Sequence, residues 1–265
     1  MLSFVACHLT AHEHNLDSRI ADYERLTSNL LLPASPHAAP GTPKTQINQS
    51  THAFLFGDLN FRLAPPSDLK GKGALGPALE RCAAEGDWSS LVAYDQLLKV
   101  RSEGRAAGGW EEAPLGGFAP TYKLRPNGKE GEYTWKRTPS WTDRILYSSA
   151  ANPTTAPDEE GRLQLHAYKP PFSETQCSDH LPVSLLVSLP VVRSVTAADA
   201  ARPIQVGPPA AESQLEREAW LGWTLDRTSG YGWAFLLSAG FGYGEKAGVA
   251  VLVVLLGVIW VLAGL

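Results

Sequence analysis

Four short segments of this chain place acids, histidines or bases directly beside an apolar run, and they constrain its fold more than any other feature. In chain order they are HLTAH (residues 8–12), GDLNFRL (57–63), PTYK with KRTPSWTDRIL (120–123 and 136–146), and SDHLPV (178–183). Functional side chains commonly lie where a rigid strand gives way to a loop. These segments therefore hold the candidate functional residues.

Strand and helix patterns alternate over residues 2–189. Helical spacing of apolar residues predicts helices at 17–32, 78–84 and 89–100, and apolar runs predict strands at 2–7, 53–56, 144–147, 163–168 and 183–189. We expect Asp17 or Ser18 to cap the first helix, and a surface insertion at 33–50, where Pro, Ala, Ser and Thr are frequent. Alternation of this kind favours a layered α/β domain.

The charge and the cysteines exclude several classes of function. A formal net charge of −4 gives no general attraction to nucleic acid or anionic lipid, so anion binding must come from a local cluster. Cys7, Cys82 and Cys177 are far apart and form no CxxC motif, which fits a reducing compartment. None is followed six residues later by Arg, so the signature of thiol-nucleophile phosphatases is absent.

The C-terminal end carries a membrane-like pattern. Residues 247–265 contain no charge, and as a helix with about 1.5 Å rise per residue they would extend about 28 Å, close to the bilayer core of about 30 Å. We expect a transmembrane tail anchor there, with the rest of the chain in the cytosol. Before it we expect a linker with a short amphipathic helix (191–228) and an aromatic, glycine-rich interfacial segment (229–246). A second, shorter membrane pass in that last segment stays open.

Asp58 and Asn60 lie two positions apart, directly after a predicted strand. In extended chain both side chains point to the same face. A carboxylate beside an amide can hold a hard cation or orient a water molecule. A plain turn is the alternative for these two residues taken alone.

Histidines occur in two of the motifs. Asp179 and His180 open a predicted strand, and an acid beside a histidine is a common arrangement for a general base. His8 and His12 flank Leu-Thr-Ala, and ordinary loop residues are the alternative for them. The zinc motif HExxH fails here, because Leu16 stands where its second histidine would be.

A local basic cluster follows in the third motif. Two ammonium groups, one guanidinium and one phenol suit a bound phosphate, and a solvated charge run is the alternative. Its members are Tyr122, Lys123, Lys136 and Arg137.

In this order, the motifs resemble the C-terminal part of the inositol polyphosphate 5-phosphatase catalytic domain, which has the DNase I-like fold. The resemblance runs from about residue 3 to residue 189. It implies an α/β fold of the α+β four-layer sandwich type over residues 1–190. The family's N-terminal half, with an Asn, a metal-binding Glu and several strands, has no counterpart before Met1. We therefore expect a partial domain, and a sequence that is a fragment of a longer protein.

The resemblance also implies roles at the reacting phosphate. His180 would activate the attacking water as general base, with Asp179 supporting the catalytic centre and Asp143 holding the active-site network together. Asp58 and Asn60 would orient the water and the phosphoryl oxygens near Mg²⁺, and both would join Asp179 as metal ligands.

Further roles concern the phosphates of the substrate. His8 would stabilise the transferring phosphate, with His12 beside it on the substrate. The basic cluster would clamp the neighbouring 4-phosphate; its members are again Tyr122, Lys123, Lys136 and Arg137.

The implied activity is Mg²⁺-dependent hydrolysis of the 5-phosphate of phosphoinositides, above all phosphatidylinositol 4,5-bisphosphate, by in-line attack of water without a phosphoenzyme. Fungal members with a hydrophobic C-terminal tail look closest, and they face the cytosol at the endoplasmic reticulum. We expect a lipid substrate, a membrane and no nucleic acid as partners. The alternatives are a catalytically dead, tail-anchored phosphoinositide-binding or scaffold protein, and a nuclease of the same fold.

Overall fold

The computed structural model describes residues 1–33, 44–64, 75–127, 129, 132–134, 136–149, 163–172, 178–190, 204–208 and 211–238. The chain divides into two compact units, Met1–Pro209 and Ala210–Leu265. The first unit contains the sheets and the candidate site. The described part of the second unit is one helix, α4 (Glu212–Ser238), with its preceding residue.

A mixed four-stranded sheet forms the centre of the first unit. Its strands are β1 (Leu2–Ala6), β4 (His52–Asp58), β6 (Asp143–Ser149) and β5 (Glu111–Glu112), in the order β1-β4-β6-β5. β1 runs parallel to β4, whereas β6 is antiparallel to both β4 and β5. The first four residues of β4 are all buried, as expected for a central strand with both faces covered.

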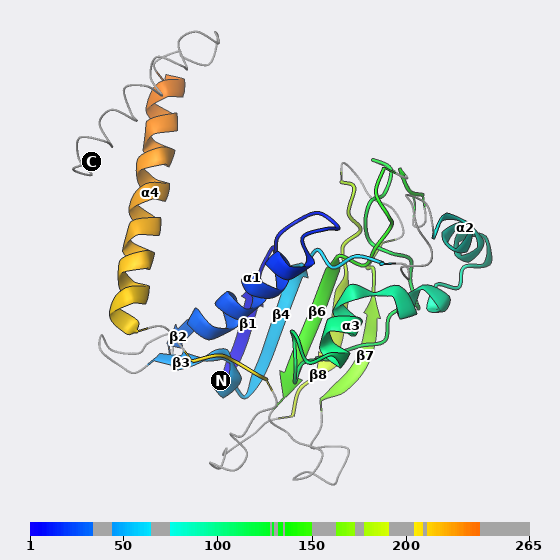
Figure 1. The fold of residues 1–265 in the computed structure, drawn as a ribbon, viewed down its shortest axis with the longest axis horizontal. Coiled ribbons are helices and arrows are strands. Elements are labelled where there is room, and N and C mark those ends of the chain that lie inside the picture. The colour runs from blue at the N-terminus through cyan, green and yellow to red at the C-terminus, as the bar shows by residue number, and fades with distance from the viewer. Residues whose placement is uncertain are drawn as a thin grey trace. The chain divides into compact units, whose positions relative to one another are not determined.

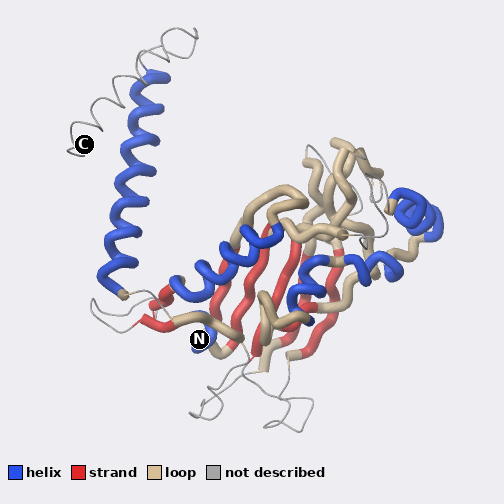
Figure 2. The backbone as a smooth tube through the Cα atoms, in the orientation of Figure 1, coloured by secondary structure: helices blue, strands red, loops and turns tan. Residues whose placement is uncertain are grey.

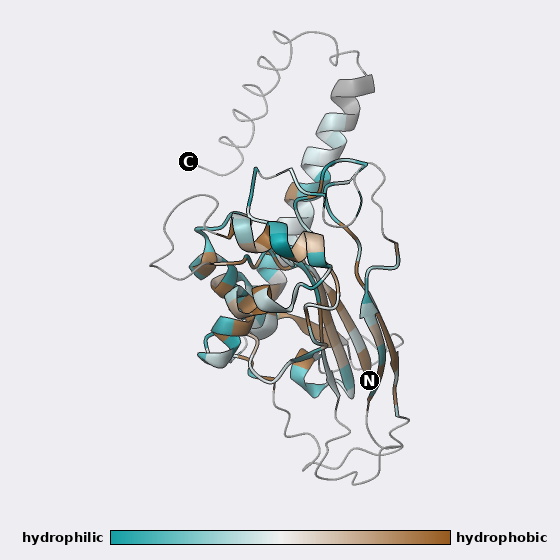
Figure 3. Ribbon diagram, turned by 90° about the vertical axis from the view of Figure 1, so that its right-hand side faces the viewer, coloured by the Kyte–Doolittle hydropathy of each residue, from teal (hydrophilic) through white to brown (hydrophobic). Residues whose placement is uncertain are grey.

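Two helices cover one face of this sheet. Figures 1 and 2 show α1 (Leu16–Asn29) and α3 (Gln96–Ser102) on the same side of it. Ile20 and Tyr23 of α1 pack into a core with Leu55 of β4 and Leu97 of α3. In Figure 3 the strands of the sheet are predominantly hydrophobic, which matches their place in the core.

The remaining elements surround the sheet. α2 (Gly76–Glu85) belongs to a second core with Trp88, Tyr133 and Trp141. Two small antiparallel sheets pair β2 (Leu31–Pro33) with β3 (Lys44–Gln46), and β7 (Gln164–Lys169) with β8 (Ser184–Ser188).

The predicted strands are all present within one to two residues, but three local predictions were wrong. The first helix starts after Asn15 and ends at Asn29, so neither Asp17 nor Ser18 caps it. The insertion predicted at 33–50 contains β3 and a 3₁₀ turn (Ile47–Gln49) in its last part, while its residues 34–43 lie outside the described residues. The single helix predicted at 89–100 is a 3₁₀ segment (Ser89–Tyr94) followed by α3, because Asp95 caps α3 by accepting a hydrogen bond from the Leu98 amide.

The C-terminal predictions meet the structure only in part. α4, with 27 residues, is longer than the short helix expected within the linker 191–228, and it crosses the boundary expected at residue 228. No helix in the described part of the chain is both long and apolar enough to cross a membrane. The predicted anchor at 247–265 lies outside the described residues.

Candidate active site

The site begins where β4 ends. Gly57 has φ +130°, and a Cβ at this position would lie 2.1 Å from the carbonyl oxygen of Cys7. Only glycine lets the two backbones approach so closely. The close crossing places Asp58 beside His8, whose Nε2 is 3.5 Å from the Asp58 carboxylate.

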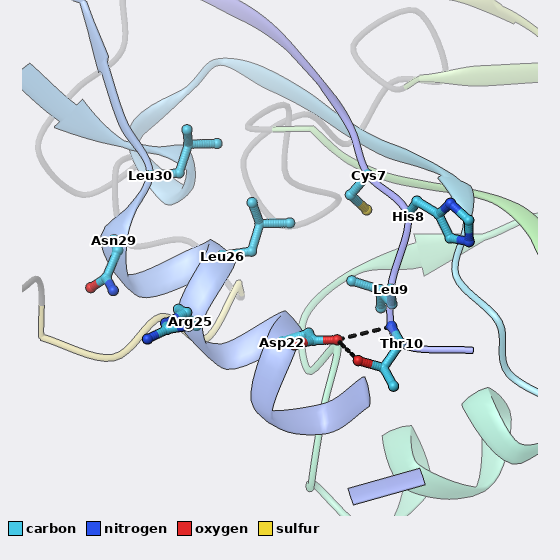
Figure 4. A pocket seen from close by; sticks show the side chains of 9 residues that line it. All are labelled: Cys7, His8, Leu9, Thr10, Asp22, Arg25, Leu26, Asn29 and Leu30. Carbon is cyan, nitrogen blue, oxygen red and sulfur yellow. Dashed lines mark hydrogen bonds between the residues drawn. The ribbon is translucent and has the colours of Figure 1, made fainter. Parts of the chain in front are cut away.

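Side chains of α1 hold the HLTAH loop. Asp22 accepts hydrogen bonds from the amide and the hydroxyl of Thr10, as Figure 4 shows. The buried Arg19 donates to the carbonyls of Thr10 and His12. The loop is therefore held at its middle residue and at its C-terminal end, with the His8 side chain largely exposed.

The third and fourth motifs meet along the segment 121–124. Tyr122 bridges to Ser140 on one side and to His180 on the other. The Leu124 amide donates to the carbonyl of Asp179, and the Leu181 amide donates to that of Thr121. This irregular three-stranded pairing brings residues from distant parts of the chain to one place.

His180 is hydrogen-bonded to Asp143, the first residue of β6. Its Nδ1 lies 3.0 Å and 3.3 Å from the two carboxylate oxygens. Thr121 and Thr142 also donate to Asp143, which fixes the carboxylate. Nε2 of His180 is 3.9 Å from Asp58. This arrangement orients the imidazole so that Nε2 faces the acidic side of the site.

The pKa values of Asp58 and His180 are shifted because both side chains are partly buried and lie near Asp143. Burial, and next the negative charge of Asp143, raise the pKa of Asp58 above its usual range. Burial alone would lower the pKa of His180, but the hydrogen bond and charge of Asp143, with the charge of Asp58, raise it above its ordinary value. The site is therefore an anionic centre that favours a positive charge.

The raised pKa of His180 leads to a prediction for the metal-free protein. In an NMR titration, its midpoint should lie above about 6.5, the ordinary value for histidine. The charged imidazole stabilises the fold below the unfolded-state pKa, and this contribution is lost as the pH rises through the folded pKa. Asp143→Asn should lower the midpoint, and an unchanged midpoint would contradict the pairing. His166, which is exposed on β7, is the reference signal.

A pocket of about 230 Å³ lies in front of this pair. Eight of the eleven predicted site residues line it: His8, His12, Asp58, Asn60, Tyr122, Arg137, Asp179 and His180. Asp143 does not line the pocket itself, but it is hydrogen-bonded to His180, which does. Lys123 contacts the pocket wall through Asp179, and Lys136 is exposed and does not line the pocket.

The three predicted metal ligands line one pocket, but two of them are held by cationic side chains. Asn60 is 2% exposed, and its side-chain oxygen accepts a hydrogen bond from Arg62. Asp179 is paired with Lys123, whose hydrogen bond lowers the pKa of the carboxyl. Within the described ranges, no group of three or more His, Cys, Asp or Glu side chains is arranged to hold a metal ion. Asp58 remains as the carboxylate facing the pocket beside two histidines.

Sequence reasoning missed three residues of the site. Glu13 lines the pocket and accepts a hydrogen bond from the Thr138 amide, and Thr121 holds Asp143. Arg62 lines the pocket although it is only 4% exposed. An arginine between two apolar residues, Phe61 and Leu63, was the one available signal of a buried charge.

Comparisons with known proteins agree with these motifs. A family model described as Endonuclease/Exonuclease/phosphatase family 2 matches residues 1–186. The chain is 32% identical over 191 residues to type IV inositol polyphosphate 5-phosphatase 3 of Arabidopsis thaliana, covering 69% of this chain and 24% of that protein. It is 31% identical over 225 residues to the mouse (Mus musculus) phosphatidylinositol polyphosphate 5-phosphatase type IV, covering 82% and 30%.

A solved structure is also similar. It is the inositol polyphosphate 5-phosphatase domain of a synaptojanin, SPsynaptojanin, with inositol (1,4)-bisphosphate and a calcium ion. The sequence identity is 28% and the TM-score 0.49, with 70% of this chain and 47% of that chain covered. The chain thus spans less than a third of the two curated relatives' length.

Proposed function

The chain belongs to the endonuclease/exonuclease/phosphatase family and, within it, to the inositol polyphosphate 5-phosphatases; from this membership we propose that it hydrolyses the 5-phosphate of phosphoinositides, with phosphatidylinositol 4,5-bisphosphate as the preferred substrate. The observation that carries the proposal is the His180–Asp143 hydrogen bond at the wall of a pocket that also presents Asp58, His8 and Arg137.

In the proposed reaction, His180 acts as the general base. Nε2 takes a proton from a water molecule as its oxygen attacks the 5-phosphorus in line with the leaving oxygen. The bond from phosphorus to the inositol oxygen breaks, and that oxygen takes up a proton. Asp143 keeps the imidazole in the required tautomer and stabilises the imidazolium that forms. His8, mostly exposed beside Asp58, is placed to contact the phosphoryl oxygens.

Asp58 is the residue that fits a divalent cation. Mg²⁺ is often held by one or two carboxylates, with water and substrate phosphate completing its shell. The raised pKa of Asp58 reflects burial and an adjacent negative charge that a cation would offset. When bound there, Mg²⁺ would neutralise charge on the phosphoryl and leaving oxygens.

The basic residues support the proposed preference for a substrate with a neighbouring 4-phosphate. Arg137 is exposed at the pocket, and Lys123 lies over the Tyr122 ring, 5.3 Å from its centroid. Lys123 is paired with Asp179, so a 4-phosphate would compete with that carboxylate for the ammonium.

We predict that the double variant Lys123→Met/Arg137→Met lowers kcat/KM for phosphatidylinositol 4,5-bisphosphate by about 10²-fold, because each charge-assisted hydrogen bond contributes about 1.5–3 kcal/mol. Activity on a phosphoinositide that carries only the 5-phosphate should change much less. The matched control is Lys99→Met/Arg105→Met, on and after α3. An equal loss on both substrates would contradict a 4-phosphate clamp. Phosphodiester cleavage that survives the double variant would favour the nuclease.

A second candidate is a phosphoinositide-binding protein without catalysis. It is favoured by the cationic side chains that hold two of the predicted metal ligands, Arg62 on Asn60 and Lys123 on Asp179. The two candidates differ in one result. The binding protein would retain phosphatidylinositol 4,5-bisphosphate on a vesicle without releasing phosphate when Mg²⁺ is added.

We also propose that the chain acts at a membrane, held by residues 247–265 as a tail anchor with the catalytic unit in the cytosol, at the endoplasmic reticulum. The uncharged sequence of that segment supports this. α4 adds a second observation, because Trp220, Trp223, Arg227 and Tyr231 recur at helical spacing. The Arg227 guanidinium lies 4.9 Å from the Trp223 ring centroid. Aromatic rings of this kind favour the headgroup layer.

This proposal predicts that brominated lipids quench the fluorescence of Trp220 and Trp223. The full chain would be reconstituted into vesicles that contain them. Trp220→Phe/Trp223→Phe should reduce the quenched share of the emission, whereas Trp88→Phe, in the core of the first unit, should leave the quenched intensity unchanged. If the quenched emission were the same in both variants, Trp220 and Trp223 would lie away from lipid.

A further inference from the structure

Arg62 is a buried cation at the floor of the pocket. It is 4% exposed, yet it lines the pocket with Asn60 and Tyr122. Among the described residues, no carboxylate lies within salt-bridge distance of its guanidinium, which contacts the two oxygens of Asn60 and the Tyr122 ring. A buried charge is normally paired, so this arrangement requires a reason.

The first contact fixes Asn60. Nε of Arg62 donates to the Asn60 carbonyl over 3.1 Å, and Nη2 donates to its side-chain oxygen. The Asn60 side-chain nitrogen donates to the Leu9 carbonyl over 3.0 Å. Asn60 has φ +57°, and its amide N–H donates to Asp58 over 3.0 Å. Arg62 thereby sets the orientation of the Asn60 amide and supports the turn that carries Asp58.

The second contact reaches the general base. The Arg62 guanidinium carbon lies 4.5 Å from the centroid of the Tyr122 ring, and that ring lies 4.6 Å from the His180 imidazole. A cation over an aromatic face contributes about 0.5–2 kcal/mol. Arg62 therefore contacts both sides of the site: the turn after β4, and the ring that packs on His180.

A second buried cation, Arg19, lies near Arg62, and the repulsion between the two charges opposes their burial. Burial, and next the charge of Arg62, lower the pKa of Arg19 to about 10. Arg62, at the pocket that would receive a phosphate, is thus held near a second buried cation. The charge of Asp58 offsets part of the positive charge at Arg19, but no carboxylate of the described residues lies within ion-pair distance of Arg62.

We propose that Arg62 is a positioning residue of the reaction proposed above. It acts by holding the Asn60 side-chain amide and the Tyr122 ring in fixed positions relative to His180. The inference rests on the proposed function, but its structural part does not. Lysine keeps the charge and cannot form the two-pronged contact with Asn60, whereas methionine loses both. Comparing Arg62→Lys with Arg62→Met therefore separates the effect of the two hydrogen bonds to Asn60 from the effect of the positive charge.

The first experiment needs no activity. In the full chain, kept in detergent micelles and labelled with ¹⁵N-asparagine, the Asn60 side-chain amide is assigned by its loss in Asn60→Asp. Its signal should shift, and its hydrogen exchange should speed up, in both Arg62→Lys and Arg62→Met. Arg105→Lys, at an exposed arginine, should leave the signal in place. An unchanged Asn60 signal in the Arg62 variants overturns the inference.

The second experiment measures kinetics. Both Arg62 variants should lower kcat by about 10²-fold, the effect of displacing catalytic groups by about 1 Å, with KM changed far less in Arg62→Lys. If Arg62 acts through the ring, its effect and that of Tyr122→Leu should be non-additive in a double-mutant cycle. Additive losses, or full kcat in Arg62→Lys, would overturn the inference. Should the wild-type chain release no phosphate, the proposed function fails, and the Asn60 signal still decides what Arg62 holds.

Discussion

Replacing His180 by alanine should lower the rate of phosphate release from phosphatidylinositol 4,5-bisphosphate by about 10²–10⁴-fold, the usual contribution of a general base. The imidazole is the one group that the structure both orients through Asp143 and directs at Asp58. Its removal takes away the imidazole that Asp143 orients toward Asp58 and that would accept the proton of the attacking water. Binding to phosphoinositide vesicles should persist, because the Arg137 and Lys123 side chains are unaffected.

The matched control for this variant is His166→Ala. His166 is exposed on β7 and bonds only to Ser188 among the described residues, so its loss should leave the rate within twofold. Asp143→Asn should give a smaller loss than His180→Ala, since the base remains but its tautomer is no longer fixed. Full activity of His180→Ala would show that another group deprotonates the water.

Arg144→Met should destabilise the first unit by about 3–5 kcal/mol, the effect of breaking a buried ion pair. The Arg144 side chain is fully buried, and it donates to both oxygens of Glu112 and to Asp95. Asp95 also caps α3. The variant leaves Asp95 in the core without its cation and leaves Glu112 with the longer ion pair to Arg101, at 3.7 Å. Urea denaturation of the full chain at neutral pH, in one detergent, measures the change.

A second variant separates charge from packing. Arg144→Met/Glu112→Leu removes one of the two buried carboxylates that lose their hydrogen bonds to Arg144, so it should be more stable than Arg144→Met alone. Arg105→Met removes an exposed pair with Asp17 and should change the stability by less than about 1 kcal/mol. If Arg144→Met and Arg105→Met behaved alike, the buried network would contribute little to folding.

The strands and the motifs that follow them were predictable because their signals are local. The apolar run of β4 ends in Gly-Asp, and the structure places Asp58 and Asn60 at the end of that strand. Asp143 instead opens β6, directly before that strand's apolar residues. The break between the 3₁₀ segment and α3 carried a local signal as well, since Asp95 before Gln-Leu-Leu is a helix N-cap.

Pairings between distant segments could not be predicted. Sequence adjacency favoured Asp179 as the partner of His180, but neighbouring side chains in extended chain point to opposite sides. In the structure Asp179 meets Lys123, and His180 meets Asp143, 37 positions earlier. The contacts of Arg62 with Tyr122 likewise depend on how the segment 121–124 pairs with Ser140 and His180.

The most direct test identifies the lipid product. The full chain would be incubated with vesicles of phosphatidylinositol 4,5-bisphosphate and Mg²⁺, with His180→Ala in parallel. The account predicts phosphatidylinositol 4-phosphate and inorganic phosphate from the wild type and almost none from the variant. Formation of phosphatidylinositol 5-phosphate would contradict the assigned position of attack, and vesicle binding without phosphate release would identify the chain as a binding protein.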